Sequence, residues 1–105
     1  MTNKILVFSA CESKDEAERL AKALLEARLA ACVNLIPQIR SFYWWKEKIE
    51  SADEYLLVIK TSADLFEQVR DLIHSKHSYD LPEVIALPIT AGSPAYLDWL
   101  TRELR

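Results

Sequence analysis

The stretch LAACVNLIPQIRSFYWWKEKIE, residues 29–50, decides how the rest of the chain can fold. The run from Val33 to Trp45 is rich in β-branched and aromatic residues and has no helical periodicity, which predicts a strand. At the usual rise, a strand of this length reaches about 43 Å. A turn near residues 46–48 then has to reverse the chain without a glycine, because the single glycine of the sequence is Gly92. The stretch therefore predicts a long β-hairpin with an uncertain turn geometry.

The hairpin is longer than any layer that could cover it. The best helical pattern, residues 13–29, would span about 25 Å, so the hairpin overshoots it by roughly 18 Å. Strict alternation places Val33, Leu35, Ile39, Tyr43 and Trp45 on one face and Ile36, Phe42 and Trp44 on the other. Both faces are aromatic near the tip, so we expect Phe42, Tyr43, Trp44 and Trp45 to form an interface with another chain. The alternative is a compact monomer whose aromatic residues fold back into its own core.

Composition bounds the class of protein. A chain of 105 residues fits one domain, residues 1–105, and its net charge of −3 argues against a nucleic-acid binder. Two cysteines are too few and too far apart in the sequence for a disulfide framework. We expect no secretory signal and no membrane span, and therefore a cytoplasmic protein.

The remaining elements follow in an order that predicts the fold. Strands are expected at residues 5–10, 55–59 and 84–89, with a break at 51–53, and helices at 13–29, from 61–64 to 74–77, and after Gly92-Ser93-Pro94. Ser13 and Glu16 have capping-box spacing, with Glu16 expected to reach back to the helix start. Pro37 and Pro88 indicate edge positions or bulges. The order predicts an α+β, ferredoxin-like βαββαβ sandwich with an extended hairpin and an extra C-terminal helix.

Few residues suggest chemistry. The sequence has no glycine-rich phosphate loop, HExxH, CxxC or Gly-x-Ser-x-Gly motif, so we expect no enzyme. The neighbours Asp53 and Glu54 are expected to form a solvated face. Soft metal ligands are limited to Cys11, Cys32, His74 and His77, of which the two histidines would share a helix face. The polar and aromatic segment 77–83 could line a cleft, or it could be a turn ordered by its own side chains.

Several blocks resemble the CutA family of divalent-cation tolerance proteins. These blocks are ARLAACVNLI (27–36), SFYWWKEKIE (41–50), HSYDLPEVIALPI (77–89) and GSPAYLDWL (92–100). The resemblance implies a ferredoxin-like subunit in a homotrimer, non-enzymatic and cytoplasmic, linked to tolerance of copper and other divalent ions. The alternative is a PII-like sensor or signalling adaptor that binds a small anion or metabolite in clefts between subunits. No cofactor is expected to be required, although Cu²⁺ or another divalent cation could bind. The sequence leaves open whether the protein has a further protein partner.

The resemblance also implies site residues. Cys11 and His77 match family positions suited to metal ligation, while Lys60, Tyr79 and Glu83 match positions expected at a ligand cleft. Three residues depart from the family pattern: Glu12 and Ser78 each replace a proline, and Glu47 replaces the glycine of the hairpin turn.

Overall fold

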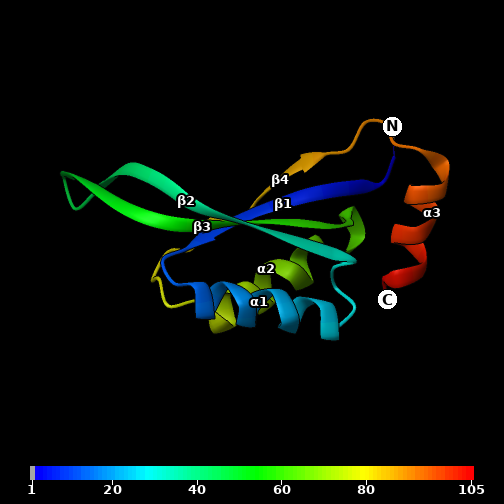
Figure 1. The fold of residues 1–105 in the computed structure, drawn as a ribbon, viewed down its shortest axis with the longest axis horizontal. Coiled ribbons are helices and arrows are strands. Elements are labelled where there is room, and N and C mark those ends of the chain that lie inside the picture. Colours follow the sequence, from blue (N-terminus) through cyan, green and yellow to red (C-terminus); the bar gives the residue numbers. More distant parts are fainter. Residues whose placement is uncertain (1) are drawn as a thin grey trace.

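A four-stranded antiparallel sheet, in the order β2-β3-β1-β4, is covered on one face by two helices (Figure 1). The computed structural model describes residues 2–105. Its elements are β1 (Lys4–Cys11), α1 (Lys14–Glu26), β2 (Cys32–Trp45), β3 (Lys48–Ser62), a 3₁₀ turn (Ala63–Leu65), α2 (Phe66–Lys76), β4 (Ile85–Pro88) and α3 (Pro94–Glu103). The predicted order and ferredoxin-like topology are confirmed, and Pro88 does lie in an edge strand.

Helix α1 begins as predicted and ends earlier. The Ser13 hydroxyl accepts a hydrogen bond from the Glu16 N–H at 3.1 Å, which caps the first turn. At the other end Arg28 adopts a left-handed backbone, with φ of 58°. The N–H groups of Arg28 and Leu29 then donate to the carbonyls of Leu25 and Leu24, each at 3.0 Å. This Schellman ending stops the helix before the predicted Leu29.

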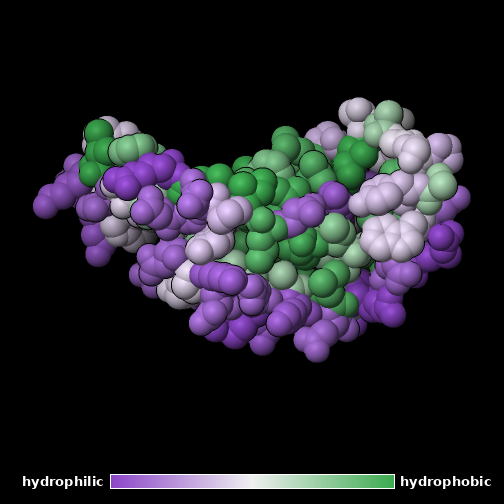
Figure 2. All heavy atoms as spheres, in the orientation of Figure 1, coloured by the Kyte–Doolittle hydropathy of each residue, from purple (hydrophilic) through white to green (hydrophobic). Residues whose placement is uncertain are grey.

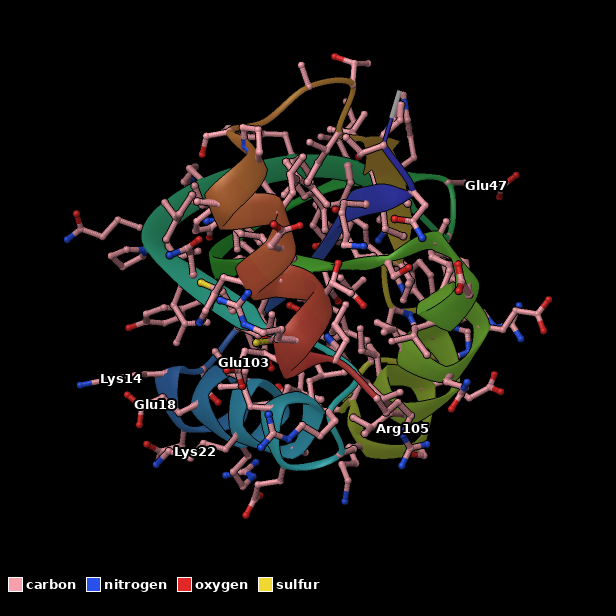
Figure 3. The ribbon with its side chains drawn as sticks, turned by 90° about the vertical axis from the view of Figure 1, so that its right-hand side faces the viewer. Lys14, Glu18, Lys22, Glu47, Glu103 and Arg105 are labelled. Carbon is pink, nitrogen blue, oxygen red and sulfur yellow. The ribbon has the colours of Figure 1, made fainter. Side chains whose placement is uncertain are left out.

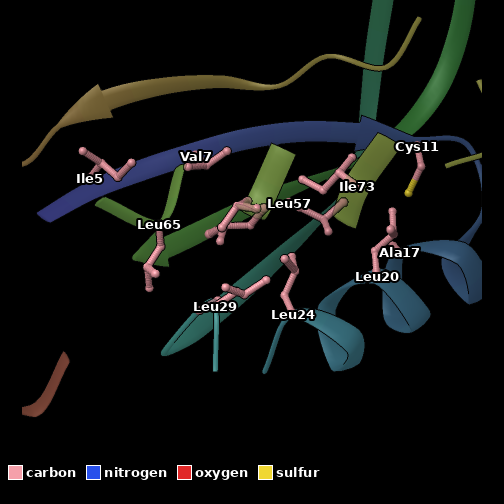
Figure 4. Close-up of a cluster of buried hydrophobic side chains, with 13 residues drawn as sticks. Ile5, Val7, Cys11, Ala17, Leu20, Leu24, Leu29, Leu57, Leu65 and Ile73 are labelled. Carbon is pink, nitrogen blue, oxygen red and sulfur yellow. The ribbon is translucent and has the colours of Figure 1, made fainter. Parts of the chain in front are cut away.

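The core lies between the sheet and the two covering helices (Figure 4). Alternate residues of β1 and β3 point into it, including Val7, Leu57 and Ile59, all fully buried. Leu24 of α1 and Ile73 of α2 meet them from the helix side. Each such aliphatic side chain contributes roughly 1.5–3 kcal/mol on burial, so this layer supplies most of the stability available to one chain.

A β-bulge at Pro37 and Gln38 changes the faces of the hairpin. Ile36 pairs with Leu56, but Ile39 pairs with Glu54, so two residues of β2 lie opposite one of β3, and Gln38 has φ of 62°. Pro37 was expected at a bulge or at an unpaired edge position, and the structure shows a bulge. The predicted alternation across it is wrong, because one extra residue moves every later side chain to the other face. Leu35 therefore faces the helices, whereas Ile39 and the residues in step with it, Tyr43 and Trp45, lie on the opposite face.

The hairpin turn contains two residues. Trp45 pairs with Lys48, while Lys46 and Glu47 have φ of 50° and 66°. Two successive positive φ angles define a type I′ turn, for which glycine is preferred. The break predicted at 51–53 is wrong, because β3 runs without interruption and these residues pair with 40–42 of β2.

The middle of the sheet face opposite the helices is apolar, and no element within residues 2–105 packs over it. Leu6, Phe8, Leu56 and Val58 are half-buried there, and Ile36, Ile85 and Leu87 are exposed. Figure 2 shows apolar side chains over the middle of the sheet, between the hairpin tip and α3. None of the helices within residues 2–105 has the length and apolar character that a membrane span requires.

Helix α3 lies at the end of the sheet away from the hairpin tip (Figure 1). Its end is tied to the end of α1 by Arg28, whose Nη1 is 2.8 Å from Glu103 Oε2 and whose carbonyl accepts from the Arg105 N–H at 3.0 Å. Figure 3 shows this end of the molecule, with Lys14, Glu18 and Lys22 on the polar side of α1.

Candidate functional site

A cavity of about 740 Å³ lies between the outer hairpin and the loop that follows α2. Residues 41–45 of β2 line one side, and residues 78–81 with Glu83 line the other. Ala10 at the end of β1 and Glu54 of β3 complete the lining. The cavity thus brings together Tyr79 and Glu83, predicted as cleft residues, with the four aromatic residues predicted as an interface.

Glu54 links the loop to the sheet. Its side chain is buried, with the residue only 8% exposed, and Oε2 accepts a hydrogen bond from the Tyr79 hydroxyl at 2.8 Å. Burial, together with this bond and the negative charge of Glu54, raises the pKa of Tyr79 above its usual value. Tyr79 is therefore a phenol donor at neutral pH. The prediction that Glu54 lies on a solvated face is wrong, whereas its neighbour Asp53 is exposed as expected.

Glu16 holds the same loop from the helix side. Its Oε2 accepts from the Ser78 N–H at 2.7 Å and its Oε1 from the Ser78 hydroxyl at 3.0 Å. The carboxylate therefore does not return to the start of α1, and the second half of the predicted capping box is wrong. Proline, which the resemblance implies at position 78, has no N–H to donate, so Ser78 makes a contact that proline could not make.

His77 is buried and fully hydrogen-bonded. Its side chain is 0% exposed, its Nε2 is 2.8 Å from the Ala10 carbonyl oxygen, and its Nδ1 accepts from the Tyr79 N–H at 3.0 Å. A carbonyl only accepts, so Nε2 carries the proton and the ring is the neutral Nε2–H tautomer. The residue follows the last turn of α2 in extended backbone, so it does not share a helix face with the exposed His74, contrary to prediction.

Cys11 lies at the end of β1 beside this network. It is fully buried, and its Sγ is 3.8 Å from the Ser13 carbonyl oxygen. Burial first, then the negative charges of Glu16 and Glu54, raises the pKa of the Cys11 thiol to about 11. Cys11 is therefore protonated at neutral pH, whereas a metal binds the thiolate.

Lys60 lies apart from the cavity within one chain. It is six residues further along β3 than Glu54, about 20 Å along the strand. Its Nζ is 3.5 Å from the Tyr96 hydroxyl and 5.7 Å from the centre of that ring. Among residues 2–105, no group of three or more His, Cys, Asp or Glu side chains is arranged to hold a metal ion.

Two buried acidic residues that hold the loop of the candidate site, Glu16 and Glu54, were not predicted from the sequence. Both belong to pairs of adjacent acids, and such pairs are usually solvated. A signal was present for Glu54, because it directly precedes the apolar run 55–59 of a central strand. No comparable signal marks Glu16, because the loop that it binds comes from 62 residues later in the chain.

Comparisons with known proteins agree with this architecture. The family model of the CutA1 divalent ion tolerance protein matches residues 5–103. The divalent-cation tolerance protein CutA of Archaeoglobus fulgidus is 47% identical over 94 residues, covering 90% of this chain and 91% of that protein. The human Protein CutA is 48% identical over 93 residues, covering 89% of this chain and 52% of that protein. The chain thus spans about half the length of the mammalian relatives and a little more of the plant ones.

Solved structures match over nearly the whole chain. The crystal structure of CutA1 from Oryza sativa has a TM-score of 0.96 at 41% identity, covering 99% of this chain and 95% of that one. The divalent cation tolerance protein from Thermus thermophilus has a TM-score of 0.95 at 38% identity, covering 97% and 99%. On the sequence match over residues 5–103 and the shared fold, this chain belongs to the CutA1 divalent ion tolerance protein family.

Proposed function

We propose that this chain acts in divalent-cation tolerance as a homotrimer that binds Cu²⁺ or a related ion weakly, through Cys11 and His77. One observation carries the proposal. The two residues lie at the same end of β1, because the His77 ring bonds to the carbonyl of Ala10, the neighbour of Cys11. Glu16 lies 3.6 Å from the same ring, and both Glu16 and Glu54 act electrostatically on Cys11. Thiol and imidazole are ligand types that suit copper or zinc, and the nearby carboxylates add negative charge that attracts a cation.

The binding should be weak because each ligand is already occupied. A metal needs the Cys11 thiolate, and deprotonation is costly when the thiol pKa is about 11. It also needs a free nitrogen of His77, whereas both nitrogens are hydrogen-bonded. A cation therefore competes with protons and with contacts that order the loop after α2. We propose that weak, reversible binding of this kind is how the protein contributes to tolerance.

The proposed homotrimer accounts for the uncovered apolar surface. Phe42 and Trp44 are 69% and 71% exposed, and the sheet face opposite the helices carries further exposed aliphatic residues. Both edge strands, β2 and β4, have one side without a partner in residues 2–105. Apolar area of this extent is typical of obligate interfaces. We place the protein in the cytoplasm and assign it no enzymatic role, although the Arabidopsis relative is named as chloroplastic.

A calorimetric titration with Cu²⁺ tests the ligands, and the chain supplies matched controls. Each proposed ligand has one counterpart of the same type, Cys32 for Cys11 and His74 for His77. We expect Cys11→Ala and His77→Ala each to weaken binding about tenfold or more. Cys32→Ala and His74→Ala should bind as the wild type does. Equal binding by all the variants, or a loss confined to the two controls, would remove Cys11 and His77 as ligands.

A further inference from the structure

Glu54 is a buried carboxylate that lacks a cationic partner within one chain. The residue is 8% exposed, and its carboxylate accepts a hydrogen bond from the neutral Tyr79 hydroxyl. No Lys, Arg or His within residues 2–105 forms an ion pair with it. A buried charge is costly unless a group of opposite charge contacts it. Because Glu54 lies in the cavity wall beside the aromatic residues expected at the interface, another copy of the chain can supply the positive group.

Lys60 has the opposite deficiency at the other end of the same sheet face. It pairs with Leu6 of β1 and Cys32 of β2, so it lies in the interior of the sheet. The residue is half-buried, and no carboxylate within residues 2–105 forms an ion pair with it. Its Nζ is 3.5 Å from the Tyr96 hydroxyl and 5.7 Å from the centre of that ring. An ammonium group has three N–H donors, so Lys60 keeps donors available for a carboxylate.

The other two lysines on this face are less suited to the role. Lys4 is buried, and its Nζ is already 2.7 Å from the Asn3 side-chain oxygen. Lys48 lies in step with Glu54 but is exposed at the hairpin tip, where water solvates its charge. Lys60 is therefore the cation of this face that gains most from contact with a carboxylate.

The spacing of the two charges fits a head-to-tail contact between copies. Glu54 and Lys60 are six residues apart on an unbroken β3, about 20 Å along the strand, so they cannot pair within one chain. The even spacing puts both on the face opposite the helices, with the half-buried Leu56 and Val58 between them. A closed ring of three identical chains needs two different, complementary surfaces on each chain. The acidic end and the basic end of this apolar face supply such a pair.

We propose that Lys60 of each copy enters the cavity of the next copy and pairs there with Glu54. The inference rests on the homotrimer proposed above and adds the contact that fixes the register of its copies. Asp80 and Glu83 also line the cavity, and no Lys, Arg or His belongs to the lining. The incoming ammonium group therefore meets only negative charge, and the same packing covers the apolar residues between the two ends. The cleft expected from Lys60, Tyr79 and Glu83 is then a site that two copies form together.

A double-mutant cycle on trimer dissociation tests the contact. Sedimentation of the protein at a fixed urea concentration gives the protein concentration at which the trimer is half dissociated. We expect Glu54→Gln, which retains an acceptor for Tyr79, and Lys60→Gln each to raise that concentration about tenfold or more. The double variant should dissociate no more readily than the weaker single variant, because removing either partner already removes the pair. Lys60→Arg keeps the charge and should stay closer to the wild type than Lys60→Gln.

The matched controls are Lys22→Gln and Glu67→Gln, on the exposed sides of α1 and α2 and outside the cavity lining. Both should dissociate as the wild type does, and circular dichroism should show the same fold for every variant. Two outcomes would overturn the contact: Glu54→Gln and Lys60→Gln dissociate like the controls, or their effects multiply in the double variant, as those of independent sites do. A wild type that sediments as a monomer would overturn the homotrimer itself, and the contact with it. Cu²⁺ binding is measured separately.

Discussion

The inner and outer halves of the β2–β3 ribbon have the same backbone pairing in very different surroundings. In the inner half, Leu57 and Ile59 are fully buried under α1 and α2. In the outer half, Phe42, Trp44 and Ile49 are 69%, 71% and 65% exposed. The pairing from Ile39 to Trp45 is nevertheless continuous, and the ribbon projects well beyond the helices (Figure 1).

The difference shows which part of the stability one chain can supply by itself. Burial by helices stabilises the inner half, whereas hydrogen bonds and cross-strand contacts alone hold the outer half. An isolated two-stranded ribbon is marginally stable in water. We therefore expect the outer half to need cover from another chain. The aromatic residues 42–45 that would receive this cover also line the cavity.

Removing core volume from the inner half should have the largest effect. Leu57→Ala leaves a cavity between sheet and helices, and we expect it to lower the free energy of unfolding by about 2–5 kcal/mol. The same loss should appear at every protein concentration in urea unfolding. The contrasting variant is Ile49→Ser in the outer half, whose effect should change with concentration because it acts through association. If the loss of unfolding free energy changed with protein concentration in the same way for both variants, the two halves would not differ in how they are stabilised.

A pH series examines the inner half alone, through Cys11. Its pKa is about 11 in the folded protein against 9.0 when unperturbed, so the folded state holds this proton more tightly. The resulting stability is complete below pH 9 and is lost as the pH rises through 11, a loss of roughly 2–3 kcal/mol. The pKa of Tyr79 is raised as well and contributes in the same direction, so the measured quantity is the difference from Cys11→Ala. Parallel stability curves for the two proteins between pH 8 and 11 would contradict the assignment.

Relaxing the hairpin turn should give the smallest effect, confined to the outer half. Glu47 has φ of 66°, a conformation that costs a side-chain-bearing residue about 1–2 kcal/mol and glycine almost nothing. Glu47→Gly should therefore raise the free energy of unfolding by about 1 kcal/mol, measured by urea denaturation. The control Lys48→Gly, in the adjacent strand position, should lower it instead. A destabilised Glu47→Gly protein would show that the turn is not strained.

The order of elements could be predicted because its signals are local. The cap at Ser13 follows from the geometry of a single residue, and so does the restriction of Pro37 and Pro88 to a bulge or an edge strand. The face of each outer hairpin residue could not be predicted. The presence of a bulge reverses the alternation, and the sequence does not state whether Pro37 causes a bulge or lies at an unpaired edge position.

The site residues named from the sequence stay predictions, and the structure shows only where one chain places them. Tyr79 and Glu83 do line one cavity, because they lie in one loop. Lys60 does not join them, since an unbroken β3 carries it to the other end of the sheet. Glu16 and Glu54 were missed because their burial depends on contacts with Ser78 and Tyr79, which are distant in sequence and meet only in the fold.

The central claim is that the outer half of the ribbon is covered by further copies of this chain. The most direct test is the mass of the wild-type protein in solution, measured by sedimentation at micromolar concentration. The account predicts three times the chain mass of 12.1 kDa, with Trp44→Ser/Trp45→Ser dissociating on dilution. A wild type that sediments at 12.1 kDa, with the outer aromatic residues exposed to solvent, would contradict it.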